Sequence, residues 1–129
     1  MAAVLIVEDN LVNQKLMQAI VSGAGYTTHV VANGRLAVEF LADHTVDLVF
    51  MDLMMPVMDG FEASRRIRQE LGLRNLPIIA VTANTLVGSR ERALESGCDD
   101  YIAKPYTKQQ LLGTLNQWIR GSSDQFHPV

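Results

Sequence analysis

The sequence has very little of what defines several protein classes. It contains one cysteine, Cys98, which excludes an internal disulfide and indicates a reducing compartment. No apolar run approaches the roughly 18 residues needed to cross a bilayer, and no basic stretch precedes an apolar one at the N-terminus. Lysine and arginine total 11 against 14 aspartates and glutamates, which argues against a basic nucleic-acid surface. We therefore expect a cytoplasmic protein without a membrane span or a direct nucleic-acid partner.

What the sequence does contain suits a single folded unit. Its 129 residues fall within the roughly 100–200 expected of one domain, and 48% of them are hydrophobic. A chain of this size buries about two thirds of the surface that it exposes when unfolded. The segment after Arg120 is short and polar, so we expect one domain over residues 1–120 and a tail or linker over 121–129.

Strand-length and helical patterns alternate along the chain. The predicted strands are Val4–Val7, Thr27–Val31, Leu48–Met51, Ile78–Val81 and Tyr101–Ala103. The helical patterns follow Asn10 as N-cap, surround Leu36–Leu41, and cover Gly60–Leu71, about Thr85–Ser96 and Thr107–Arg120. Short continuous apolar runs are typical of strands buried on both faces of a parallel sheet. The alternation predicts an α/β domain with right-handed crossovers.

Polar residues stand where the predicted strands end. Glu8 and Asp9 end the first strand, Asp52 the third, Thr82 the fourth and Lys104 the fifth. Because the carboxyl ends of parallel strands share one edge, where ligands bind in open α/β sheets, we expect these side chains to meet there. Clustered carboxylates raise one another's pKa unless a cation neutralises them, and Mg²⁺ prefers oxygen ligands. The pattern favours a Mg²⁺ site.

These residues lie in motifs that resemble the receiver domains of two-component response regulators. The motifs are Val7-Glu8-Asp9-Asn10 with Asn13-Gln14, Met51 to Gly60, Ala80 to Asn84, and Asp99 to Pro105. The first motif and the Met-Met-Pro-x-Met-Asp-Gly run are most similar to receivers of hybrid sensor histidine kinases. The resemblance implies a flavodoxin-like doubly wound fold, with a five-stranded parallel sheet of order 2-1-3-4-5 and five helices.

The resemblance also implies a role for each residue of the site. Asp52 would be the phosphoacceptor and would also contact Mg²⁺, which Asp9 would bind directly, Glu8 mainly through water, and Met54 through its backbone carbonyl. Lys104 would neutralise phosphoryl oxygens.

Two further features are implied around this centre. Thr82 would donate its hydroxyl to the phosphoryl group, and Tyr101 would be the aromatic switch residue, turning inward as Thr82 moves. The alternative for Tyr101 is an ordinary half-buried strand tyrosine with its hydroxyl in water. A cis bond between Lys104 and Pro105 is implied by the resemblance alone.

The expected function is that of a phosphorelay receiver. It would take a phosphoryl group from a phosphohistidine, on a histidine kinase dimerisation domain or a histidine phosphotransfer protein, and switch a partner-binding surface. Such a domain assists its own aspartyl phosphorylation and dephosphorylation without being a conventional enzyme, although a parent hybrid protein would be a histidine kinase. A free-standing response regulator and a docking pseudo-receiver that works without phosphorylation are the alternatives.

Two other classes fit the residues less well. A haloacid-dehalogenase-like phosphatase needs a second acid two residues after the nucleophile, where this chain has Met54. A flavodoxin-like FMN binder must hold a phosphate in its first loop, which Glu8 and Asp9 would repel. Arg65, Arg66 and Arg68 are interpreted as a solvated, ion-paired helix face.

Overall fold

The computed structural model describes residues 2–83 and 87–124 of the chain. Five strands and five helices alternate along them. The elements are β1 (Ala3–Val7), α1 (Leu11–Gly23), β2 (Thr27–Val31), α2 (Gly34–Asp43), β3 (Leu48–Asp52), α3 (Gly60–Gln69), β4 (Ile78–Thr82), α4 (Ser89–Glu95), β5 (Asp100–Ala103) and α5 (Lys108–Asp124). Within the described ranges, no helix is both long enough and apolar enough to cross a membrane.

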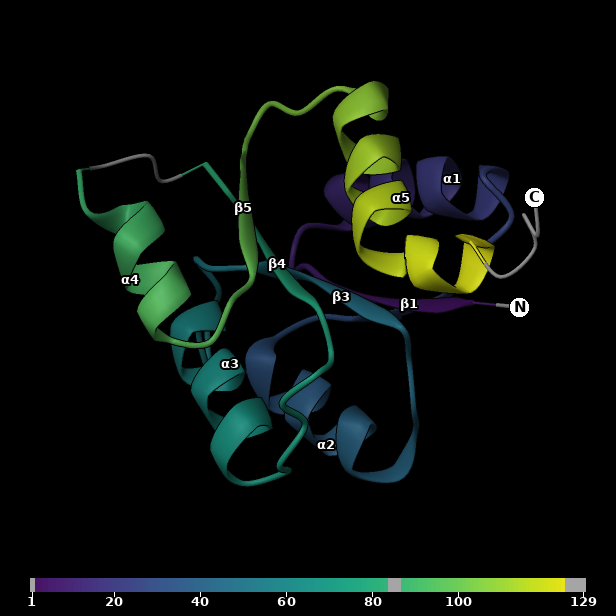
Figure 1. The fold of residues 1–129 in the computed structure, drawn as a ribbon. Coiled ribbons are helices and arrows are strands. Elements are labelled where there is room, and N and C mark those ends of the chain that lie inside the picture. The colour runs from purple at the N-terminus through teal and green to yellow at the C-terminus, as the bar shows by residue number, and fades with distance from the viewer. Residues whose placement is uncertain (1, 84–86, 125–129) are drawn as a thin grey trace.

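The strands form one parallel sheet whose order is β2-β1-β3-β4-β5 (Figure 1). β3 and β4 are buried along their whole lengths, because strands in the middle of the sheet have helices on both faces. This arrangement confirms the flavodoxin-like doubly wound fold. It also brings the ends of β1, β3, β4 and β5 to one edge.

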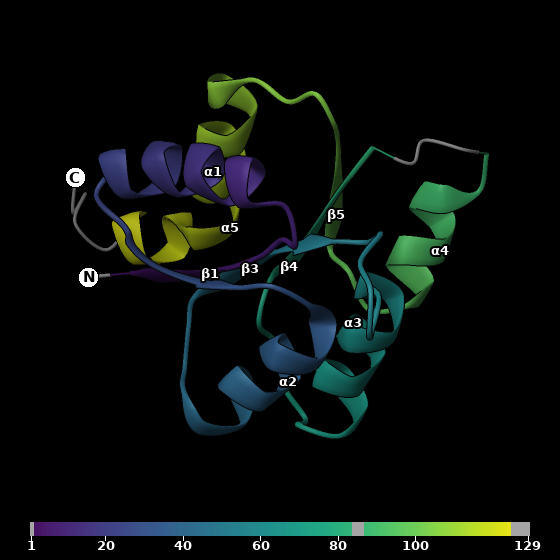
Figure 2. The same ribbon diagram turned by 180° about the vertical axis from the view of Figure 1, so that it is seen from behind.

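Two apolar layers hold the helices on the sheet. α1 and α5 cover one face, and α2, α3 and α4 lie on the other (Figures 1 and 2). Alternate strand residues supply the two layers, as Leu5 and Ile6 of β1 illustrate. The sheet therefore has a hydrophobic core on each face. A functional site can lie at the carboxyl edge, which is the edge formed by the carboxyl ends of the strands.

Element boundaries differ from the prediction in two places. The last helix continues to Asp124 instead of ending at Arg120, because a glycine inside a helix costs only about 1 kcal/mol and does not by itself stop it. The predicted start of the fourth helix at Thr85 lies outside the described residues, as does Asn84. α4 begins only after Gly88, whose φ of 88° is left-handed and cannot continue a helix.

Arg68 joins three segments at the end of the sheet opposite the carboxyl edge. Its guanidinium donates to the carbonyl oxygens of Leu73 and Leu76 at 2.6 Å and of Gly97 at 2.7 Å, and contacts Asp99 at 2.8 Å. Its side chain is only 14% exposed. The interpretation of Arg68 as a solvated arginine is therefore wrong, whereas Arg66 does pair with Glu62 and Glu70 on the surface.

Replacing Arg68 with methionine is expected to lower the free energy of unfolding by about 3 kcal/mol, because several carbonyls and a carboxylate lose their partner. Arg66→Met is the matched control. Its ion pairs are exposed and screened by solvent, so the loss is expected to be much smaller than for Arg68. Urea unfolding of both variants measures the difference, and equal losses would contradict the role given to Arg68.

Candidate functional site

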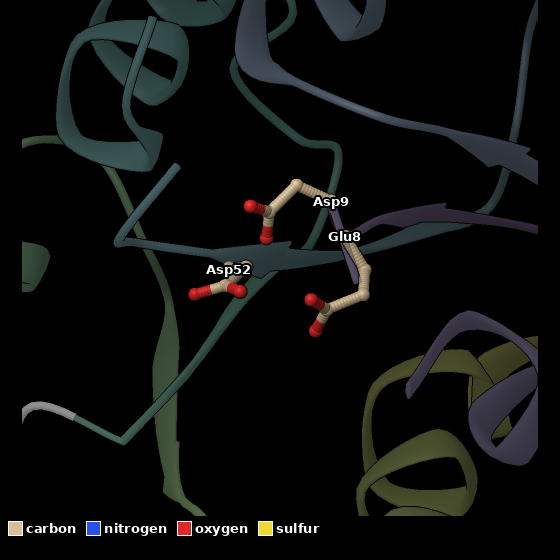
Figure 3. Close-up of side chains that lie close together, drawn as sticks. All are labelled: Glu8, Asp9 and Asp52. Carbon is tan, nitrogen blue, oxygen red and sulfur yellow. The ribbon is translucent and has the colours of Figure 1, made fainter. Parts of the chain in front are cut away.

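The three carboxylates predicted to meet do so at the carboxyl edge of the sheet. Glu8 and Asp9 follow β1, and Asp52 is the last residue of β3. One oxygen from each lies within 4.8 Å of the others. Figure 3 shows that Glu8 and Asp9 leave the end of β1 in different directions, with Asp52 beside them on the neighbouring strand. An all-oxygen cluster of this kind has the chemistry of a hard-cation site.

Asp52 is a buried carboxylate with a raised pKa. Burial raises the pKa of Asp52 to about 6, although the Met54 backbone amide, which donates to Oδ1 at 3.1 Å, and the Lys104 charge oppose it. The negative charge of Glu8 raises it further. Burial disfavours the ionised form of Asp52, and a cation bound at the site would stabilise that form.

Lys104 supplies one positive charge to this cluster. Its Nζ lies 2.9 Å from Glu8 Oε1 and 3.3 Å from Asp52 Oδ2. Burial acts to raise the pKa of Glu8, but the hydrogen bonds from Lys104 and from the Asn10 amide outweigh it and lower that pKa. Burial acts to lower the pKa of Lys104, but the bonds to Glu8 and the Asp52 charge raise it. At neutral pH, both Lys104 and Glu8 are charged.

Thr82 lies at the same edge as the last residue of β4 and is fully buried. Its carbonyl oxygen accepts a hydrogen bond from the Lys104 backbone amide at 2.8 Å. The peptide bond between Lys104 and Pro105 is cis, as the resemblance implied. The ends of β4 and β5 are therefore held together directly beside Asp52, whose strand neighbours β4.

Comparison with known proteins identifies the family. Residues 4–116 match the response regulator receiver domain family. The chain belongs to it. Its relatives include the polar-differentiation response regulator DivK of Brucella anthropi, which is 35% identical over 117 residues, covering 91% of this chain and 95% of DivK.

Solved structures of sensor histidine kinase receivers are also similar. The receiver domain of the kinase PA1611 from Pseudomonas aeruginosa is 44% identical, with a TM-score of 0.84 over 92% of this chain and 97% of that one. Its structure has a magnesium ion coordinated in the active-site cleft. The signal receiver domain of a Syntrophus aciditrophicus histidine kinase is 35% identical, with a TM-score of 0.87 over 94% of this chain and 92% of that one.

Tyr101 of this receiver domain is half-buried in β5 and points to α4. The side chain is half-buried, as the alternative for Tyr101 predicts, but its hydroxyl has a protein partner, because it donates to Ser89 Oγ at 3.2 Å. Ser89 is the first residue of α4. A change in the Tyr101 ring would therefore reach α4 at its N-terminal end.

The loop between β3 and α3 is shaped by its backbone. A Cβ at Gly60 would collide with the carbonyl oxygen of Asp52, so only glycine lets α3 begin this close to the receiver's site. Val57 has a φ of 72°, a left-handed conformation that is strained for a β-branched residue. The close approach at Gly60, whose backbone amide also donates to the Leu53 carbonyl at 3.2 Å, ties the start of α3 to the end of β3.

Three contacts of Glu8 in the receiver site were not predicted from the sequence. Gln14 Nε2 donates to the Glu8 carbonyl at 2.6 Å, and the Asn10 backbone amide donates to Glu8 Oε2 at 3.0 Å. The Asn10 and Gln14 positions were marked by motif, but no pattern indicated that they hold Glu8. The pairing of Lys104 with Glu8 was also missed.

The raised pKa of Asp52 predicts a pH-dependent stability. A folded pKa of about 6 exceeds the ordinary value of 3.8, so Asp52 favours folding below about pH 4, and this contribution is lost as the pH rises through 6. Without Mg²⁺ at pH 7.5, Asp52→Asn is expected to raise the free energy of unfolding by about 1–2 kcal/mol. The gain should vanish near pH 4. Urea unfolding in EDTA tests this, and an equal gain at both pH values would contradict it.

Proposed function

We propose that this receiver domain accepts a phosphoryl group from a phosphohistidine onto Asp52, as one step of a two-component phosphorelay. The observation that carries the proposal is a buried Asp52 with two other carboxylates and one lysine around it. An Asp52 oxygen attacks the phosphorus, and the phosphorus–nitrogen bond breaks. Its electron pair returns to the donor imidazole, which takes a proton from solvent, and Asp52 becomes an acyl phosphate.

Mg²⁺ fits the donor set of this site. Asp9 and Asp52 would hold it directly, with the Met54 carbonyl as a further ligand and Glu8 acting mainly through water. When bound, the ion neutralises charge on the phosphoryl oxygens. Within the described part of the chain, the Asp9 side chain makes no hydrogen bond or ion pair, so the oxygen that it brings to the cluster could bind a cation without first losing a protein partner.

Lys104 and Thr82 would complete the phosphoryl site. The Lys104 ammonium is already 3.3 Å from Asp52 Oδ2, where it would neutralise a phosphoryl oxygen once one is attached. Thr82 would donate its hydroxyl, and its movement would change the space open to Tyr101. We propose that Tyr101 and α4 pass this change to a partner-binding surface, because Tyr101 is bonded to Ser89.

An apolar surface on α1 suits contact with a protein that carries the phosphohistidine. Leu11, Val12 and Leu16 are 61%, 73% and 51% exposed. Leu16 also lines a cavity of about 300 Å³ that Lys104 and Pro105 share, so the surface is continuous with the site. Exposed apolar side chains grouped in this way are typical of interaction surfaces.

The similarity to receivers of sensor histidine kinases supports an origin in a hybrid kinase, and hence a cytoplasmic setting. The similarity to DivK keeps a free-standing response regulator as the second candidate. We propose that the receiver domain reaches the end of α5 at Asp124 in either case, four residues beyond the predicted boundary at 120, and that a tail or linker follows it.

Phosphorylation by two donors tests the proposal. Acetyl phosphate with Mg²⁺ should add one phosphoryl group to the intact mass, and a phosphorylated histidine phosphotransfer domain should do the same. Val12→Glu should slow transfer from the protein donor about tenfold or more, because it places a charge in an apolar contact, and leave acetyl phosphate labelling unchanged, because Val12 does not line the cavity shared with Lys104. An unmodified mass with every donor would favour the docking pseudo-receiver.

A further inference from the structure

Both oxygens of the Glu8 carboxylate are already occupied by protein donors. Oε1 accepts from Lys104 Nζ at 2.9 Å, and Oε2 accepts from the Asn10 backbone amide at 3.0 Å. The Glu8 side chain is 4% exposed. Two hydrogen bonds on a buried carboxylate fix its orientation, so Glu8 is directed at the lysine.

The pair spans most of the sheet. Glu8 follows β1 and Lys104 follows β5, and β3 and β4 lie between them in the strand order. Neighbouring strands are about 4.8 Å apart, so the two backbones are separated by roughly 14 Å at this edge. Only two long side chains meet across that distance. An aspartate at position 8 would be shorter by one methylene and would fall short.

Lys104 is shared unequally between its two partners. Its Nζ is 2.9 Å from Glu8 and 3.3 Å from Asp52 Oδ2, so the closer contact is with Glu8. Without Glu8, Asp52 would be the remaining carboxylate partner of Lys104. An ammonium paired closely with Asp52 would cover the oxygen that attacks the phosphorus.

We propose that Glu8 is a positioning residue for Lys104, holding the ammonium beside Asp52 without letting it close on the phosphoacceptor. The pair itself is a property of the folded chain, and its effect on phosphorylation rests on the proposed function. Glu8 thereby acts on the reaction through Lys104, in addition to any water-mediated contact with a metal.

A thermodynamic cycle in EDTA tests the pair independently of phosphorylation. Lys104→Met is made in the natural chain and in Glu8→Gln, and unfolding in urea is measured for all four proteins. Lys104→Met should increase the unfolding equilibrium constant about tenfold more when Glu8 is present than when it is glutamine. Equal effects in the two backgrounds would overturn the proposal.

A spectroscopic signal separates positioning from a general structural role. The ¹⁵N-detected ammonium of Lys104 should be protected from exchange in the natural chain and in Asp9→Asn, which removes a charge from the site but leaves the pair. It should be lost in Glu8→Gln and Glu8→Asp. A signal that survives in both Glu8 variants would overturn the proposal.

The functional consequence is measured with acetyl phosphate at saturating Mg²⁺. Glu8→Gln and Glu8→Asp should each slow labelling about tenfold, because Lys104 closes on Asp52. Unchanged labelling rates would overturn the positioning role. If the natural chain is not labelled at all, the proposed function fails, and the cycle and the ammonium signal still decide whether Glu8 holds Lys104.

Discussion

Asp52→Asn is expected to abolish phosphorylation, leaving the intact mass unchanged after incubation with acetyl phosphate and Mg²⁺. The amide of asparagine does not replace a carboxylate as the nucleophile. Asparagine nevertheless has the size of aspartate and keeps the same place at the end of β3. The loss would not reflect unfolding, because removing this buried carboxylate is expected to stabilise the fold above pH 6.

The neighbouring acids make this a strict test of the nucleophile. Glu8 and Asp9 each bring an oxygen within 4.8 Å of the Asp52 carboxylate. Distance alone would therefore allow the phosphoryl group to be transferred to Glu8 or Asp9 instead of Asp52. Asp43→Asn, at the exposed far end of α2, is the control and should be labelled as fully as the natural chain. Labelling of Asp52→Asn at the natural level would refute the phosphoacceptor role.

Asp9→Asn is expected to weaken Mg²⁺ binding by at least roughly a hundredfold, because a full charge is lost beside a dication in a partly buried site. Asp9 is the exposed member of the cluster, while Glu8 and Asp52 are buried and accept hydrogen bonds from the protein. Its carboxylate is therefore the one that a metal can take without breaking a protein contact.

Calorimetric titration with Mg²⁺ measures this effect, and Asp43→Asn again serves as the control because it removes an equal charge far from the cluster. Labelling by acetyl phosphate should fall together with Mg²⁺ affinity in Asp9→Asn. An unchanged affinity would show that Asp9 is not a ligand, whatever happens to the labelling rate.

Much of this arrangement could be predicted from the sequence, because it depends on backbone geometry alone. The continuous apolar runs at Val4–Val7 and Ile78–Val81 predict buried parallel strands, and parallel strands end at one edge. The convergence of Asp9, Asp52 and Lys104 follows from that rule without knowledge of any side-chain conformation.

The contacts that escaped prediction depend on side-chain reach. The Glu8–Lys104 pair joins residues 96 positions apart, and no periodicity records how far two extended side chains span. The prediction for Arg68 was wrong for a related reason. Arg66 has glutamates four residues to either side, and this pattern predicted a solvated, ion-paired position for the neighbouring arginines as well. The Arg68 side chain instead reaches the Gly97 carbonyl, which is far away in the sequence.

The contacts of Arg68 hold the two ends of α4 differently. Arg68 binds Gly97 and Asp99 just beyond the C-terminus of α4, whereas Gly88 begins the helix without a side-chain cap and Ser89 is bonded to Tyr101. If Tyr101 acts as the switch proposed above, its movement would displace the N-terminal end of this helix, which is only about 10 Å long, more than its C-terminal end. A partner that distinguishes the two states is then expected to contact α4 near exposed Val87 rather than near Leu94.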